Sequence, residues 1–197
     1  MKLLASFLLV LSTGVMAYLF LAIPFLKPQV ATNSDLDVRI MRGTLLITPV
    51  ISSPISVILW VVESSIASLI LRRADRKREA SLNLKLVMEE LSLAYIPVFA
   101  FLLIVIPLLW FNLPDYTVTS AEGLITAARA IGRSPLYVNA MLALLAVSLS
   151  RYPLYAIILR YRLGTGWKIS AFIVLSLLLV DAIVAWAGGL GKGVGPA

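Results

Sequence analysis

Residues 91–111 read LSLAYIPVFAFLLIVIPLLWF, an uncharged and mostly apolar run. An α-helix needs about 20 mostly apolar residues to cross a hydrocarbon layer about 30 Å thick. The run shows no period-two alternation, which excludes a strand of a transmembrane β-barrel. This stretch therefore predicts a membrane-spanning helix.

Four further stretches have the same character. The five expected spans are residues 3–26, 45–71, 91–111, 135–159 and 169–187. Their only charged residues are Glu63, Arg151 and Asp181. A bilayer imposes this segregation, because a charge at its centre costs about 2.5–3.5 kcal/mol even on the lenient insertion scale. We expect an all-α fold: a polytopic bundle of five transmembrane helices in one integral membrane domain, residues 1–197, ending in a flexible glycine-rich tail, residues 188–197.

The composition agrees with a membrane protein. Hydrophobic residues make up 60% of the chain and charged residues 14%, and the mean hydropathy is +0.97. A soluble domain has roughly 45–50% apolar and about 25% charged residues. The absence of cysteine and histidine removes disulfides, thiolate metal sites and the commonest metal ligand, so we expect no cofactor and no metal. Thermolabile residues are sparse, which suggests a heat-adapted source.

The first span resembles a signal peptide at its start. Lys2 precedes the apolar run, and Val15-Met16-Ala17 loosely suits a cleavage site. A secretory apolar region is only about 7–15 residues long, whereas this run continues to Leu26. An uncleaved first helix is therefore the favoured interpretation.

Lys and Arg predict the orientation of the spans, because cytoplasmic flanks are enriched in these residues. The largest basic cluster follows the second span and comprises Arg72, Arg73, Arg76, Lys77, Arg78 and Lys85. Placing it inside gives ten Lys and Arg residues on the cytoplasmic side and six outside. We therefore expect a multi-pass protein of the cell membrane with a cytoplasmic N-terminus and an external C-terminus.

In this orientation Arg72, Arg73, Arg76, Lys77 and Arg78 would lie directly against the inner leaflet. Such clusters attract anionic lipid at about 1 kcal/mol per residue. Two interpretations stay open: the cluster only fixes the topology, or it docks anionic lipid headgroups or a protein partner. We do not expect a nucleic-acid partner.

The segments between the spans are short. Residues 27–44 are expected to form a polar outer loop. Residues 112–134 are expected to contain a short interfacial helix, because Thr119-x-x-Glu122 reads as a capping box and Gly132 is a natural stop. Residues 82–91 form an amphipathic stretch that would lie along the interface.

The three charges inside the expected spans are the sharpest chemical feature. Glu63 and Arg151 each lie eight residues from the inner end of their span, so their depths match. Asp181 lies nearer the outer side by about five residues, or roughly 7 Å of helix rise, which an arginine side chain covers. We expect an intramembrane charge cluster in which Arg151 pairs with Glu63, and Asp181 is a second or alternative partner.

Small and hydroxyl residues share a helix face with each charge, which indicates faces packed against other helices. These faces are Ser52, Ser56, Trp60, Glu63 and Ala67 on the second span, Ala140, Leu144, Ser148, Arg151 and Tyr155 on the fourth, and Ser170, Val174, Asp181, Ala185 and Gly188 on the fifth. Pro153 frees the Leu149 carbonyl in the same region.

Two interpretations of the charge cluster stay open. It is a static ion pair that holds three helices in register, or a site for proton- or cation-coupled transport. The second rests on charge counting: full ionisation of two carboxylates beside one guanidinium leaves one negative charge in a low-dielectric site.

The residues give little support to an enzyme, and we expect no catalytic residues. The common intramembrane metalloproteases and phosphatases need histidine, and aspartyl intramembrane proteases need a Gly-Asp dipeptide; the sequence contains neither. The only close aspartate pair, Asp35 and Asp37, lies in an expected outer loop, whereas the magnesium-binding aspartates of polyprenyl and phosphatidyl transferases face the cytoplasm.

Over residues 45–187 the layout resembles the Yip1 family of five-span membrane-trafficking proteins. The resemblance is carried by the basic turn after the second span, by Ala94-Tyr95-Ile96-Pro97 and by the Arg160–Lys168 turn. The glycine-rich cytoplasmic motif typical of that family is replaced by Arg72-Arg73-Ala74-Asp75. The resemblance implies a non-enzymatic, membrane-organising protein with its N-terminus inside.

A second resemblance concerns Ala127-Ala128-Arg129-Ala130-Ile131-Gly132-Arg133-Ser134-Pro135, which is similar to the coupling-loop motif of ABC-transporter permeases. Thr126 stands where a glutamate leads that motif. The resemblance implies a permease subunit whose loop faces the cytoplasm, whereas the orientation above places this loop outside.

We therefore expect a non-enzymatic protein that acts through lateral helix contacts, as a membrane-organising protein or an accessory subunit of a larger membrane complex. Its expected partners are the lipid bilayer, anionic lipid headgroups, and other membrane subunits or further copies of the chain. The alternative is a small transporter or ABC-type permease subunit that uses Glu63, Arg151 and Asp181.

Single cysteines test the orientation, since the chain has none of its own. In Arg72→Cys the thiol is expected to react with a membrane-impermeant reagent only when the cytoplasmic face is open, because basic flanks stay inside. Asp115→Cys, in the expected outer loop, is the matched control and should react from the exterior. Exterior labelling of Arg72→Cys would reverse the orientation and favour the permease alternative.

Overall fold

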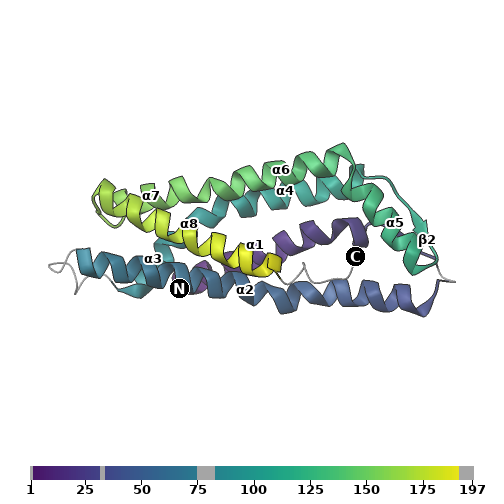
Figure 1. Cartoon of the computed structure of the whole chain (residues 1–197), viewed down its shortest axis with the longest axis horizontal. Helices are drawn as coiled ribbons and strands as arrows, with labels where there is room; N and C mark the ends of the chain where they lie inside the picture. Colours follow the sequence, from purple (N-terminus) through teal and green to yellow (C-terminus); the bar gives the residue numbers. More distant parts are fainter. Residues whose placement is uncertain (1, 32–33, 75–82, 191–197) are drawn as a thin grey trace. The chain divides into compact units, whose positions relative to one another are not determined.

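The computed structural model describes residues 2–31, 34–74 and 83–190, and this part of the chain is almost wholly helical (Figure 1). Among the residues singled out above, Arg76, Lys77 and Arg78 lie outside the described residues, as do residues 191–197 of the expected tail. Side chains are described except at residues 49–53, 185 and 187–190.

Helices dominate the chain from end to end. They are α1 (Lys2–Leu26), α2 (Leu36–Ala74), α3 (Leu84–Leu91), α4 (Ile96–Asn112), α5 (Ala121–Gly132), α6 (Pro135–Leu149), α7 (Arg151–Tyr161) and α8 (Trp167–Leu190), with a 3₁₀ turn at Ser92–Tyr95 and two short strands, β1 (Gln29–Val30) and β2 (Thr117–Val118).

Within the described residues, five helical stretches are long and apolar enough to cross a membrane. They are Lys2–Leu26, Pro54–Ala74, Leu84–Asn112, Pro135–Tyr161 and Trp167–Val184. The expected all-α fold is thereby confirmed, and five apolar helices fit a multi-span membrane protein.

Two helices extend beyond the boundaries predicted from the sequence. The expected outer loop 27–44 is wrong over much of its length, since α2 already begins at Leu36. Asp37 in its first turn favours the helix N-terminus, although it lowers the hydropathy. At the other end of the chain, α8 continues to Leu190, so the first part of the expected tail is helical.

The expected helix in the loop 112–134 is present as α5, but its cap differs. The N-cap is Ser120, whose hydroxyl accepts the Gly123 N–H at 3.2 Å, and not Thr119. The capping box of Thr119 and Glu122 was therefore wrong by one residue. The helix ends at Gly132, as the glycine predicts.

The fourth span is interrupted between α6 and α7, at Ser150. Pro153 explains the interruption, because proline has no N–H and its ring clashes with the carbonyl four residues earlier, that of Leu149. The helical hydrogen bonding resumes one residue later, where the Leu154 N–H donates to the Ser150 carbonyl at 3.3 Å. A new helical N-terminus therefore lies inside an apolar stretch.

The chain divides into two compact units. Unit 1 comprises Met1–Ser6, Leu59–Ala94 and Ser150–Ala197, and unit 2 comprises Phe7–Ile58 and Tyr95–Leu149. Unit 1 thus contains α3, α7, α8 and the C-terminal part of α2. Unit 2 contains α4, α5, α6 and both strands.

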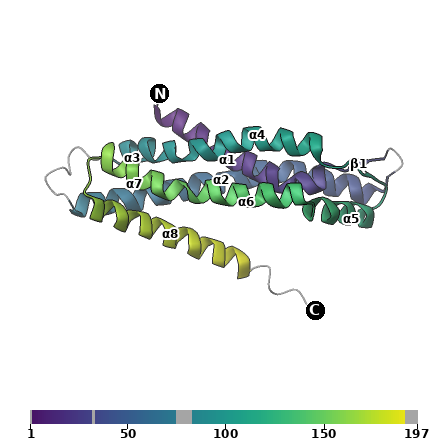
Figure 2. The ribbon, with the colours of Figure 1, turned by 90° about the horizontal axis from the view of Figure 1, so that it is seen from above.

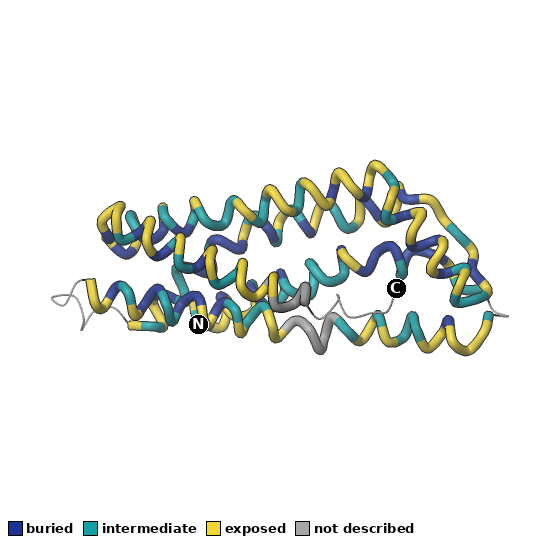
Figure 3. Tube along the Cα trace, viewed as in Figure 1, coloured by how far each residue is buried: buried dark blue, intermediate teal, exposed yellow. Residues whose placement is uncertain are grey.

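In unit 2, α4 packs along α6 (Figure 2). Their shared core includes Phe20 of α1, whose ring stacks on that of Tyr137 with centroids 5.5 Å apart. Buried and exposed positions alternate around both helices (Figure 3), as expected when one face packs on protein and the other on lipid. Beside this core β1 pairs in parallel with β2, with Gln29 opposite Thr117.

Candidate functional site: a charge cluster in unit 1

Glu63 is held on the buried face of α2. The buried residues of this face recur at helical spacing: Trp60, Glu63, Ser64, Ala67, Ser68 and Leu71. Trp60 donates its indole N–H to the Met88 carbonyl at 3.2 Å, which fixes α2 against α3. The exposed fraction of Glu63 is 0%, so its carboxylate depends wholly on protein partners.

Arg151, the first residue of α7, bridges two carboxylates. Its Nη2 lies 3.3 Å from Oε1 of Glu63, and the same nitrogen donates to Oδ2 of Asp181 on α8. The ion pairs expected from depth and helix face are therefore present, with both carboxylates engaged at once. This one guanidinium links α2, α7 and α8.

Two tyrosines complete the cluster. Tyr155 donates its hydroxyl to Oε2 of Glu63 at 2.8 Å, and Tyr152 donates to Oδ2 of Asp181 at 2.5 Å. Their rings also flank the cation, with the Arg151 Cζ 5.4 Å from the Tyr152 centroid and 5.7 Å from that of Tyr155. Each carboxylate thus receives one guanidinium and one phenol.

Sequence reasoning missed the part played by the tyrosines. The sequence predicted that Tyr155 shares a helix face with Arg151 but predicted no partner for it, and it predicted no role for Tyr152. The missing information was the packing of α7 against α8, which brings Asp181 within reach of both Arg151 and Tyr152. The available sequence signal for these contacts was the presence of two tyrosines, Tyr152 and Tyr155, close to Arg151 within the fourth span.

Exposure differs across the cluster. Glu63 is fully enclosed, whereas about a fifth of each partner is exposed, 19% of Arg151 and 20% of Asp181. Full ionisation of these three side chains leaves one net negative charge. In a low-dielectric site this charge is unfavourable unless a further group compensates it. Asp181 is the carboxylate that remains partly exposed and therefore accessible to such a group.

The basic residues after α2 lie apart from the cluster. Arg72 and Arg73 are both exposed at the end of α2, and Arg72 is nine residues beyond Glu63, roughly 13 Å of helix rise. They form a separate candidate site. Within the described part of the chain, no group of three or more His, Cys, Asp or Glu residues is placed to hold a metal ion.

Comparison with known proteins adds no relative. No protein-family model, curated protein or solved structure matches this chain.

A double-mutant cycle tests the ion pair. Arg151→Leu is expected to destabilise the protein by about 3–5 kcal/mol, because it leaves the buried Glu63 charge uncompensated. Adding Glu63→Gln should recover much of that loss. Unfolding by denaturing detergent, followed by circular dichroism, provides the measurement.

Arg72→Leu is the matched control for Arg151→Leu, since it removes the same charge at an exposed position. It should change stability by less than about 1 kcal/mol. Equal losses in Arg151→Leu and in the double variant would mean that Glu63 and Arg151 do not act as a pair.

Proposed function

We propose that this protein acts without catalysis, through lateral helix contacts in the membrane, as an accessory subunit of a larger complex or as a membrane-organising protein of the Yip1 type. The observation that carries the proposal is the uneven burial of the charge cluster. Glu63 is enclosed by Arg151 and Tyr155, while the Arg151–Asp181 edge remains about a fifth exposed. The enclosed part joins helices of unit 1, and the open edge is available to a neighbouring span.

The surface around Asp181 supports a lateral contact. Leu178 and Val184 lie three residues to either side of Asp181, about 60° from it around α8, and both are exposed. Contact of this face with lipid tails is unfavourable, because its apolar side chains surround one polar group that carries excess negative charge. Contact with a span that presents a basic or hydroxyl side chain is favourable, whether that span belongs to another subunit or to a second copy of this chain.

Site-specific photocrosslinking in native membranes tests this proposal. A photoreactive residue at Leu178 or Val184 is expected to give protein adducts, because these positions border the open edge. At Leu179 or Ile183, exposed on the opposite face of α8, it should give lipid adducts only. Asp181→Asn should weaken the protein adducts. Equal yields from the two faces, or lipid adducts alone, would contradict the proposal.

A second candidate function, a small transporter or permease subunit, is favoured by the broken fourth span. Secondary transporters place the ends of discontinuous helices against charged substrates near the bilayer midplane. Here the first residue of α7, Arg151, contacts two carboxylates with one guanidinium. In this candidate Glu63, Arg151 and Asp181 would line a path, and the excess negative charge would bind a proton or a cation.

Thiol accessibility separates the two candidates. Ser64 is fully buried beside Glu63, so in Ser64→Cys the thiol is expected to resist a charged, water-soluble reagent in the folded protein and to react after denaturation. Asp115→Cys, at an exposed position, is the control and should react at once. Rapid labelling of Ser64→Cys in the folded protein would indicate a water-filled path and favour the transporter.

A further inference from the structure

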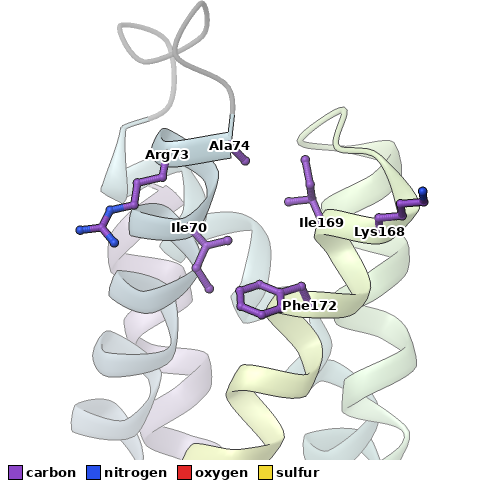
Figure 4. Close-up of a pocket in the computed structure, with 6 residues that line it drawn as sticks. All are labelled: Ile70, Arg73, Ala74, Lys168, Ile169 and Phe172. Carbon is purple, nitrogen blue, oxygen red and sulfur yellow. The ribbon is translucent and has the colours of Figure 1, made fainter.

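A groove lies between the end of α2 and the start of α8 in unit 1 (Figure 4). It encloses about 430 Å³ and is lined by Ile70, Arg73, Ala74, Lys168, Ile169 and Phe172. Figure 4 shows Phe172, Ile169 and Ile70 facing the gap between the two helices. The sequence does not predict this groove, since its two walls are almost 100 residues apart.

The groove is amphipathic along its length. Ile70, Ile169 and Phe172 provide an apolar wall. Arg73 and Lys168 stand at the helix ends, and in Figure 4 their charged ends point outward, away from the gap. Both are exposed, so their long side chains are able to turn toward a ligand between them. The lining thus combines a hydrocarbon-binding wall with two cations at one end.

Aromatic residues place the charged end of the groove at the membrane interface. Trp167, directly before Lys168, packs edge-on against Tyr161 with centroids 6.4 Å apart, and both are exposed. Arg160 lies over the Trp167 ring, 6.0 Å from its centroid. Trp and Tyr are enriched at the headgroup level of membranes. We therefore expect Lys168 at headgroup depth and Phe172, one helical turn further along α8, at the depth of the acyl chains.

Among the described residues, basic side chains predominate at this end of the groove. Arg162 lies 3.5 Å from Glu90 and Arg160 donates to the Thr165 carbonyl, so these two cations are engaged. Within the described residues, no acidic side chain forms an ion pair with Arg73 or Lys168. An anionic group between them would gain favourable electrostatics at the headgroup level.

We propose that this groove binds one anionic phospholipid, with its phosphate between Arg73 and Lys168 and one acyl chain along Ile70, Ile169 and Phe172. A lipid with a single net negative charge complements the two cations. A zwitterionic lipid would bring a positive group to the same place. The site is independent of the charge cluster and of the proposed lateral contact, since it uses different residues.

Native mass spectrometry of the full chain with added phosphatidylglycerol tests the site, with phosphatidylcholine of the same chains for comparison. One tightly held phosphatidylglycerol per chain is expected. The double variant Arg73→Gln/Lys168→Gln should bind it roughly 25-fold more weakly, because each basic residue near an anionic group contributes about fivefold. Arg129→Gln/Arg133→Gln removes the same charge at exposed positions of unit 2 and should leave binding unchanged.

A third variant separates a groove from a charged surface. Ala74→Trp keeps both cations and fills the space between the helices, so it should also abolish tight binding. Ala74 is exposed, and the fold can be checked by circular dichroism. The site is disproved if Ala74→Trp binds normally, if the Arg129/Arg133 variant loses as much affinity, or if phosphatidylcholine binds equally well.

Discussion

The bridging of two carboxylates by Arg151 is the interaction on which unit 1 depends. Hydrocarbon offers no water to solvate a charge, so each ionised group must find its partners inside the protein. The guanidinium reaches Glu63 on α2 and Asp181 on α8, and the two phenols of α7 supply a further donor to each acid. Displacing any one of the three helices would leave a charge unsatisfied, which makes the relative placement of α2, α7 and α8 specific.

The cluster lies where the fourth span is interrupted. Pro153 has no N–H to donate to the Leu149 carbonyl, and α7 begins two residues earlier, at Arg151. Arg151 and Tyr152 both contact Asp181 through their side chains, and Tyr155, one turn later, contacts Glu63. The first turns of α7 therefore supply donors to both acids.

The sequence allowed the five spans and the Arg151 pairing to be predicted because both follow from one-dimensional quantities, hydropathy and distance along a helix. It did not allow the tyrosine contacts to be predicted, since these depend on how α7 packs against α2 and α8. The early start of α2 was missed because Asp37 and Arg39 lower the hydropathy without opposing a helix. The groove of Arg73 and Lys168 depends on two distant helix ends meeting, and no local pattern contains that information.

The two candidate functions are alternative ways of resolving one imbalance of charge. Glu63 is enclosed and receives both Arg151 and Tyr155, so exchange of its partners would require α7 to move. Asp181 is bound by Arg151 and Tyr152 yet remains a fifth exposed, so a new partner can approach it without rearranging the helices. A neighbouring span would neutralise Asp181 permanently, whereas a proton or cation would do so reversibly. A structural partner and a transported ion would therefore both bind at Asp181. In either case Glu63 holds Arg151 in place.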